Sequence, residues 1–99
     1  MALRVKISVR AAAQTRRAAE WWVANRPSAP DAVGKDVGEA VALLSEQPGI
    51  GSTYDGARTL GIRRLYLGRI GYFIYYRECD GTLEVLALWH ARREVPPRL

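Results

Sequence analysis

The dipeptide Asp80-Gly81 lies between two runs rich in β-branched and aromatic residues, and it constrains the fold more than any other feature. An Asp-Gly pair is typical of a type I′ turn, because both central residues of that turn need a positive φ angle. With these residues as the loop, the facing pairs are Cys79–Thr82, Arg77–Glu84, Tyr76–Val85, Ile74–Ala87 and Tyr72–Trp89. The opposite charges of Arg77 and Glu84 support this register. Residues 61–93 are therefore predicted to form three consecutive antiparallel strands.

This register divides the predicted hairpin into two faces, and both are largely apolar. One face holds Tyr72, Ile74, Tyr76, Val85, Ala87 and Trp89, and the other holds Gly71, Phe73, Tyr75, Arg77, Glu84, Leu86, Leu88 and His90. A strand that is apolar on both sides is usually covered on both sides. We expect helices to cover one face, and a partner, a substrate or a tail of the chain to cover the other.

The first half of the chain predicts one strand followed by two helices. Residues 3–9 alternate between apolar and polar side chains, which is typical of a half-buried strand, and Ser8 is a candidate N-cap. Alanine-rich residues 10–26 and the apolar stripe within residues 30–47 each predict a helix, while residues 48–60 form a turn-rich connector. The element order β-α-α-β-β-β predicts an α+β fold, in which an N-terminal αα-hairpin packs on an antiparallel sheet.

Two tryptophans and two helical glycines predict how the helices meet. Trp21 and Trp22 are adjacent, so we expect Trp22 in the core and Trp21 at its flank; the alternative is that one of them anchors a partner. Gly34 and Gly38 lie four residues apart in the second helix, where they leave a flat surface. We expect Trp21 or Trp22 to pack on that surface.

The charge of the chain is basic and is concentrated in its second half. The net charge is +5, and residues 58–99 hold eight arginines against four acidic residues. Thirteen of the fifteen basic residues are arginine, whose planar fork of donors suits phosphate and carboxylate. This bias favours an acidic partner, either nucleic acid or an acidic protein segment. The alternative explanation is a genome that encodes arginine and alanine freely.

Length and residue types set further limits. Ninety-nine residues with 48% hydrophobic content predict a single domain spanning residues 1–99. Cys79 is the single cysteine, so the chain has no internal disulfide, and no metal-ligand cluster is visible; we expect no metal and no cofactor. The sequence shows neither a membrane-spanning apolar run nor a signal peptide, so we expect a soluble cytoplasmic protein without a membrane partner.

Several short segments occur in a characteristic order and spacing. They are Asn25-Arg26-Pro27, Leu43-Leu44 with Pro48-Gly49-Ile50-Gly51, Gly61-Ile62-Arg63-Arg64, Tyr72-Phe73-Ile74-Tyr75-Tyr76-Arg77, and Leu86 with Trp89-His90-Ala91-Arg92-Arg93. Together they resemble the RelE/ParE superfamily of bacterial type II toxin–antitoxin toxins. The last segment is similar to the ParE branch, whose typical members end on a strand leading into His-x-x-Arg or His-x-Arg-Arg.

The resemblance implies a small toxin that is held inactive by a cognate antitoxin, in a pair of the plasmid-stabilisation type. The antitoxin's acidic, amphipathic tail would cover the groove between helices and sheet, and operator DNA would be contacted only through the antitoxin. ParE toxins are described as DNA gyrase poisons. We therefore expect gyrase to meet the basic residues Arg63, Arg64, His90, Arg92 and Arg93. We expect the antitoxin to meet Trp21, Trp22, Phe73, Tyr75, Leu86 and Leu88.

Two alternative functions remain open. RelE-branch toxins cleave messenger RNA on the ribosome, and such chemistry here would use His90, Arg64 and Arg77 as acid–base and cationic groups. However, ribonucleases of the superfamily usually also carry lysines, or a Glu with a Tyr, and this chain has no lysine after Lys35. His90 also has a purely structural interpretation as a strand-end residue facing Gly71. The other alternative is a non-toxic module that binds the antitoxin and co-represses its operon.

Overall fold

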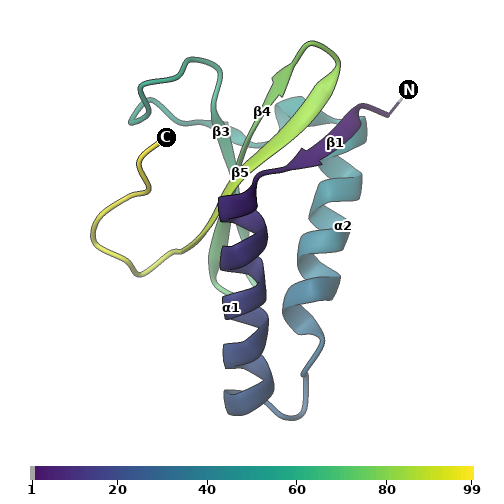
Figure 1. The fold of residues 1–99 in the computed structure, drawn as a ribbon, viewed down its shortest axis with the longest axis vertical. Helices are drawn as coiled ribbons and strands as arrows, with labels where there is room; N and C mark the ends of the chain where they lie inside the picture. The colour runs from purple at the N-terminus through teal and green to yellow at the C-terminus, as the bar shows by residue number, and fades with distance from the viewer. Residues whose placement is uncertain (1) are drawn as a thin grey trace.

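A computed structural model describes residues 2–99 and shows two helices packed on one sheet (Figure 1). The elements are β1 Arg4–Ile7, α1 Val9–Asn25, α2 Ala32–Glu46, the 3₁₀ turn η1 Pro48–Ile50, β2 Ser52–Thr53, β3 Arg63–Leu67, β4 Tyr72–Cys79 and β5 Thr82–His90. The five strands lie in the order β1-β5-β4-β3-β2. All neighbours are antiparallel except β1 and β5, which run parallel. The α+β prediction is confirmed, and β2 is an additional strand within the predicted connector.

The β4–β5 turn confirms the Asp-Gly prediction. Asp80 and Gly81 have φ angles of 51° and 75°, as a type I′ turn requires. The strand pairing follows the predicted register from Cys79–Thr82 as far as Tyr76–Val85. A bulge then intervenes, because Tyr75 pairs with Ala87 and leaves Leu86 as an extra residue on β5.

The bulge corrects the predicted pairing beyond it. Ile74 pairs with Leu88 instead of Ala87, and Tyr72 pairs with His90 instead of Trp89. Leu88 consequently joins the main core under the helices, whereas Ala87 and Trp89 belong to the cluster on the opposite face. One extra residue therefore exchanges the faces of the whole end of β5.

The main core lies between the helical hairpin and the sheet. Ser8 caps α1 as predicted, because its hydroxyl accepts a hydrogen bond from the backbone N–H of Ala11 at 2.9 Å. The buried core residues are Ala11 and Ala18 of α1, Ala32, Val33, Val37, Ala40 and Leu44 of α2, and Leu67, Ile70, Ile74, Tyr76, Leu83, Val85 and Leu88 of the sheet and its turn. The helices thus cover the face of the sheet that we call the helix face.

The C-terminal tail covers the opposite face, which we call the tail face. Pro97 is buried, and Leu99 packs with Ile62 and Tyr75. The indole N–H of Trp89 donates to the carbonyl oxygen of Val95 at 2.9 Å, which fixes the start of the tail. Figure 1 shows the tail curving away from the end of β5 and returning to the loop between β2 and β3, where the backbone N–H of Arg58 donates to the carbonyl oxygen of Leu99 at 2.9 Å. Of the three expected covers for this face, the structure shows the tail.

Strand β1 differs from its prediction as a half-buried strand. All four of its residues are exposed, including Val5 and Ile7 at 45% and 47%. The reason is its place at the sheet edge, where α1 packs against β5 and α2 makes only a few contacts with β1. Its alternating pattern fits an edge strand that the helices cover only slightly.

The two helical glycines also differ from their prediction, because no tryptophan packs on them. A Cβ atom added at Gly34 or Gly38 would meet no atom within 4 Å. Both positions lie inside α2, where glycine is less favourable than alanine by about 1 kcal/mol. The double substitution Gly34→Ala/Gly38→Ala is expected to raise the free energy of unfolding by about 1–2 kcal/mol in urea titration. As a control, Ala42→Gly at an exposed position of the same helix should lower the free energy of unfolding by about 1 kcal/mol. A destabilised Gly34→Ala/Gly38→Ala variant would instead show that other side chains pack closely on the two glycines.

Candidate functional site

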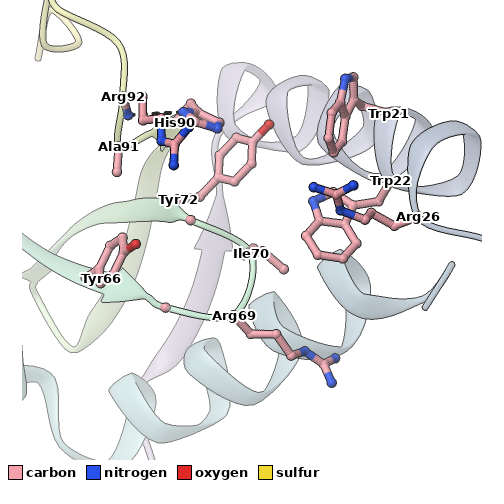
Figure 2. Close-up of a pocket in the computed structure, with 12 residues that line it drawn as sticks. Trp21, Trp22, Arg26, Tyr66, Arg69, Ile70, Tyr72, His90, Ala91 and Arg92 are labelled. Atoms are coloured by element: carbon pink, nitrogen blue, oxygen red, sulfur yellow. Dashed lines mark hydrogen bonds between the residues drawn. The ribbon is translucent and has the colours of Figure 1, made fainter. Parts of the chain in front are cut away.

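An open cleft lies where the second half of α1, the β3–β4 turn and the end of β5 meet (Figure 2). Its volume is about 640 Å³, and its lining residues are Trp21, Trp22, Arg26, Tyr66, Gly68, Arg69, Ile70, Gly71, Tyr72, His90, Ala91 and Arg92. A smaller hollow of about 270 Å³ shares Trp21, Tyr72 and His90 with it, and adds Gln14, Arg17, Ala18, Leu88 and Arg93. We refer to the two hollows together as the cleft.

The bulge in β5 brings His90 into this cleft. Because it exchanges the faces of β5, His90 lies opposite Tyr72, on the helix face. The two rings meet edge to face with their centroids 5.0 Å apart. The backbone N–H of Ala91 donates to the carbonyl oxygen of Gly71 at 2.9 Å and fixes the chain directly after the strand. His90 is therefore held at the end of β5 between α1 and the β3–β4 turn.

Hydrogen bonds define what His90 and Tyr72 can offer a ligand. The Nδ1 atom of His90 accepts a hydrogen bond from the backbone N–H of Arg92 at 3.1 Å. In the neutral imidazole the proton therefore resides on Nε2, which is a donor. Burial raises the pKa of Tyr72, so its hydroxyl stays protonated at neutral pH and can also donate.

The cleft is cationic and its lining contains no carboxylate. The lining arginines are Arg17, Arg26, Arg69, Arg92 and Arg93. Arg69 forms an ion pair with Asp36 of α2 at 2.9 Å, and Figure 2 shows its side chain turned away from His90. The other four form no ion pair among residues 2–99. These four charges are therefore available to an acidic ligand.

The structure divides the predicted gyrase-binding residues into two groups. His90, Arg92 and Arg93 lie together at the cleft. Arg63 instead donates to the carbonyl oxygen of Gly51 at 2.7 Å, near η1. The guanidinium of Arg64 lies over Phe73, 4.3 Å from the ring centroid, and donates to the Tyr75 hydroxyl at 3.2 Å. Arg63 and Arg64 therefore line no part of the cleft.

The three residues considered for RNA cleavage are not brought together. Arg64 packs on the tail face with Tyr75, and Arg77 is paired with Glu84. His90 lies on the helix face, so the sheet separates it from the ring cluster that holds Arg64. The hydrogen bond that Arg77 donates to the Glu84 carboxylate raises the pKa of Arg77, in keeping with a stable ion pair. The geometry thus assembles no common site from these residues.

The predicted antitoxin-binding residues also divide between the two faces. Trp21 is 49% exposed, and it lines the cleft with the half-buried Trp22. Leu88 is buried in the main core. On the tail face, Tyr75 is buried in the cluster that also contains Phe73 and Leu86. Only the two tryptophans present a sizeable surface beside the cationic cleft.

Sequence reasoning missed several cleft residues: Arg17, Arg26 and Tyr66, together with Tyr72 as a cleft wall. Arg17 lies on the polar face of α1, and Arg26 lies at its C-terminal end. A charged side chain at such positions usually contacts only solvent. One signal was available, because Arg26 follows Trp22 by four residues and so shares its helix face. In the structure the Arg26 guanidinium lies 5.6 Å from the centroid of the Trp21 ring.

Within residues 2–99, no helix combines the length and the apolar character needed to cross a bilayer. The same residues contain no group of three or more His, Cys, Asp or Glu side chains placed to hold a metal ion.

Comparison with known families and structures decides the affiliation. The family model described as the ParE toxin of the type II toxin–antitoxin system, parDE, matches residues 5–95. The chain belongs to this ParE toxin family. A solved chain from the chromosomal ParDE toxin–antitoxin system of P. aeruginosa superposes with a TM-score of 0.74 at 22% identity, covering 91% of this chain and 97% of that one. No curated protein matches the sequence. The resemblance to the ParE branch of type II toxin–antitoxin toxins is confirmed.

Proposed function

We propose that this ParE-family toxin arrests growth by inhibiting DNA gyrase in the cytoplasm, and that a cognate antitoxin neutralises it. The supporting observation is the cleft, where His90, Arg92 and Arg93 join Arg17 and Arg26 without a lining carboxylate. Unpaired cations around exposed aromatic rings are typical of a docking surface. The family affiliation supports gyrase as the target because ParE toxins are described as gyrase poisons.

The arrangement of the candidate catalytic groups favours gyrase over messenger RNA. Acid–base catalysis needs the acid, the base and the phosphate-binding cations within reach of one another. Here Arg64 lies on the tail face and Arg77 is held by Glu84, while His90 lies at the cleft. An inhibitor that acts by binding has no such requirement.

The same cleft supports neutralisation by occlusion. An acidic, amphipathic antitoxin segment would find four unpaired arginines beside the half-exposed ring of Trp21. Charge complementarity of this kind accelerates association and excludes wrong partners. By covering Arg92 and His90, the antitoxin would block the surface that we assign to gyrase. Operator DNA would then be reached only through the antitoxin.

The test is a pair of assays with the purified toxin. We expect supercoiling by purified gyrase to stop in its presence, and to resume when the antitoxin is added at equal concentration. We expect no cleavage of messenger RNA on programmed ribosomes. Ribosome-dependent cleavage with normal supercoiling would replace the gyrase proposal by the RelE-type function. Inactivity in both assays would leave the co-repressor role.

A further inference from the structure

Strand β1 forms an open edge of the sheet beside β5 (Figure 1). The backbone N–H groups of Arg4 and Ser8 point towards β5, where they donate to carbonyl oxygens at 3.1 Å and 3.0 Å. Because the backbone groups of successive strand residues point in alternate directions, those of Val5 and Ile7 point away from β5. Within residues 2–99 no strand pairs with β1 on that outer side. The N–H and C=O groups of Val5 and Ile7 are therefore available to a further strand.

A row of alternating charges crosses the sheet on the tail face and ends at this edge. Lys6 of β1 is paired with Glu84 of β5, and Glu84 is paired in turn with Arg77 of β4. Arg77 and Glu84 form an ion pair, whereas Lys6 forms none among residues 2–99. Opposite charges at facing strand positions attract each other, and like charges repel. An acidic residue opposite Lys6 on a further strand would therefore continue the row.

The intervening residues of β1 present an apolar row on the helix face. Val5 and Ile7 are paired with two residues of β5 that are buried in the main core. The side chains of Val5 and Ile7 themselves remain exposed, because the helices cover β1 only slightly. Apolar side chains on a further strand would cover them and extend the core. The two rows together specify a strand in which acidic and apolar residues alternate.

A second copy of this chain does not have that pattern. Two β1 strands would pair antiparallel about a two-fold axis. An axis at Lys6 places the two Lys6 side chains opposite each other, and an axis at Val5 places Arg4 opposite Lys6. An axis at Ile7 would set Val5 opposite Val9, which already belongs to α1. Like charges or the helix therefore oppose each of these pairings.

We propose that β1 binds an extended segment of a partner protein as a sixth strand, in which acidic residues alternate with apolar ones. The acidic side chains lie opposite Arg4 and Lys6, and the apolar ones cover Val5 and Ile7. Strand addition takes affinity from the backbone hydrogen bonds and specificity from the alternate side chains. This surface lies beside the start of β5, whereas the cleft lies at the end of β5. The inference therefore goes beyond the proposed function and does not depend on gyrase.

The experiment follows the backbone amides of the isotope-labelled full-length chain by NMR while a synthetic peptide is added. The peptide has about ten residues, in which glutamate and valine alternate. We expect the amide hydrogens of Val5 and Ile7 to exchange at least about ten-fold more slowly when the peptide is bound. The amide of Ser8, which already donates to β5, should change little. A peptide with the same glutamates and valines in two blocks should bind at least about five-fold more weakly.

Three variants of the chain separate the backbone contribution from the charge contribution. Val5→Pro removes an outward N–H that β5 does not use, and an edge strand tolerates proline at such a position. It should weaken peptide binding about five-fold, measured at the Ile7 amide. Arg4→Gln/Lys6→Gln should also weaken binding about five-fold. The control Arg16→Gln/Lys35→Gln removes the same charge at exposed positions outside β1 and should change binding by no more than about two-fold. The amide spectrum of each variant checks its fold.

Three results would overturn the inference. The first is unchanged exchange at Val5 and Ile7 with about 1 mM peptide, including the case in which only cleft residues respond. The second is equal binding of a peptide in which lysine replaces glutamate. The third is a dimer of the free chain in which the Val5 and Ile7 amides are already protected, which would show a second copy on this edge. Because gyrase and antitoxin are absent from these assays, such results would leave the proposed function untouched.

Discussion

The double charge reversal Arg92→Glu/Arg93→Glu is expected to abolish growth arrest while leaving the fold intact. Both residues are exposed and follow the end of β5, and neither forms an ion pair among residues 2–99. The structural cost is therefore small: the lost stacking of Arg93 on Trp89 is worth about 0.5–1 kcal/mol. Losing two charge-assisted contacts to the target costs about 1.5 kcal/mol each, so half-inhibition of gyrase should need at least about 100-fold more toxin.

A control variant with the same change in net charge distinguishes an effect of the cleft from an effect of the overall charge of the protein. Arg4 of β1 and Arg58 of the β2–β3 loop are exposed and line none of the hollows described above. Arg4→Glu/Arg58→Glu should therefore stay toxic, with gyrase inhibition within a few-fold of the wild type. Retained toxicity in a folded Arg92→Glu/Arg93→Glu variant, or an equal loss in the control, would refute the assignment of the cleft. Circular dichroism and thermal unfolding establish that each variant is folded.

The substitution Gly51→Ala is expected to cause the largest loss of stability. Its φ of −68° suits any residue, so space and not conformation requires glycine here. An added Cβ would collide with the hydroxyl of Tyr76 and lie 2.8 Å from the backbone oxygen of Arg64. Tyr76 is fully buried, and its hydroxyl accepts from the Gly51 N–H at 2.9 Å and donates to the Pro48 carbonyl oxygen at 2.7 Å.

Neither neighbour can move cheaply. Arg64 is paired with Ser52 across β2 and β3, and moving Tyr76 breaks both of its buried hydrogen bonds. Overpacking of about 1–3 kcal/mol and an unsatisfied buried group of about 1–3 kcal/mol together predict a loss of about 2–6 kcal/mol. For a domain of this size the midpoint of thermal unfolding should fall by about 15 °C or more.

The neighbouring glycine is the matched control for this prediction. A Cβ at Gly49 would meet no atom within 4 Å. Gly49→Ala should therefore change the free energy of unfolding by no more than about 0.5 kcal/mol. Similar unfolding midpoints for the two alanine variants would contradict the packing described around Tyr76.

The parts of the fold that local chemistry specifies could be predicted from the sequence. Asp80-Gly81 selects a turn with two positive φ angles, and the Ser8 hydroxyl caps the helix that follows it. The bulge at Leu86 could not be predicted, because both faces of β5 are apolar and no polar residue marks the change of face. That single extra residue places Leu88 on the helix face, and Ala87 and Trp89 on the tail face.

The site was less predictable than the fold because it is assembled from distant segments. His90, Arg92 and Arg93 were predicted as site residues at the end of β5, but Arg17 of α1 and Arg26 at its C-cap line the same cleft. Charge pattern alone does not tell which arginines a fold brings together. The cover of the tail face stayed open among a partner, a substrate and the tail for a different reason, since the proline-rich tail around Pro97 has no strand or helix periodicity.

The most direct test of the account is the amount of cleaved DNA that purified gyrase accumulates with and without this toxin. The account predicts that cleaved DNA accumulates in the presence of the wild-type chain, and that the Arg92→Glu/Arg93→Glu variant leaves it at the level of gyrase alone. An unchanged amount of cleaved DNA with folded wild-type toxin in excess would contradict gyrase poisoning through the cleft.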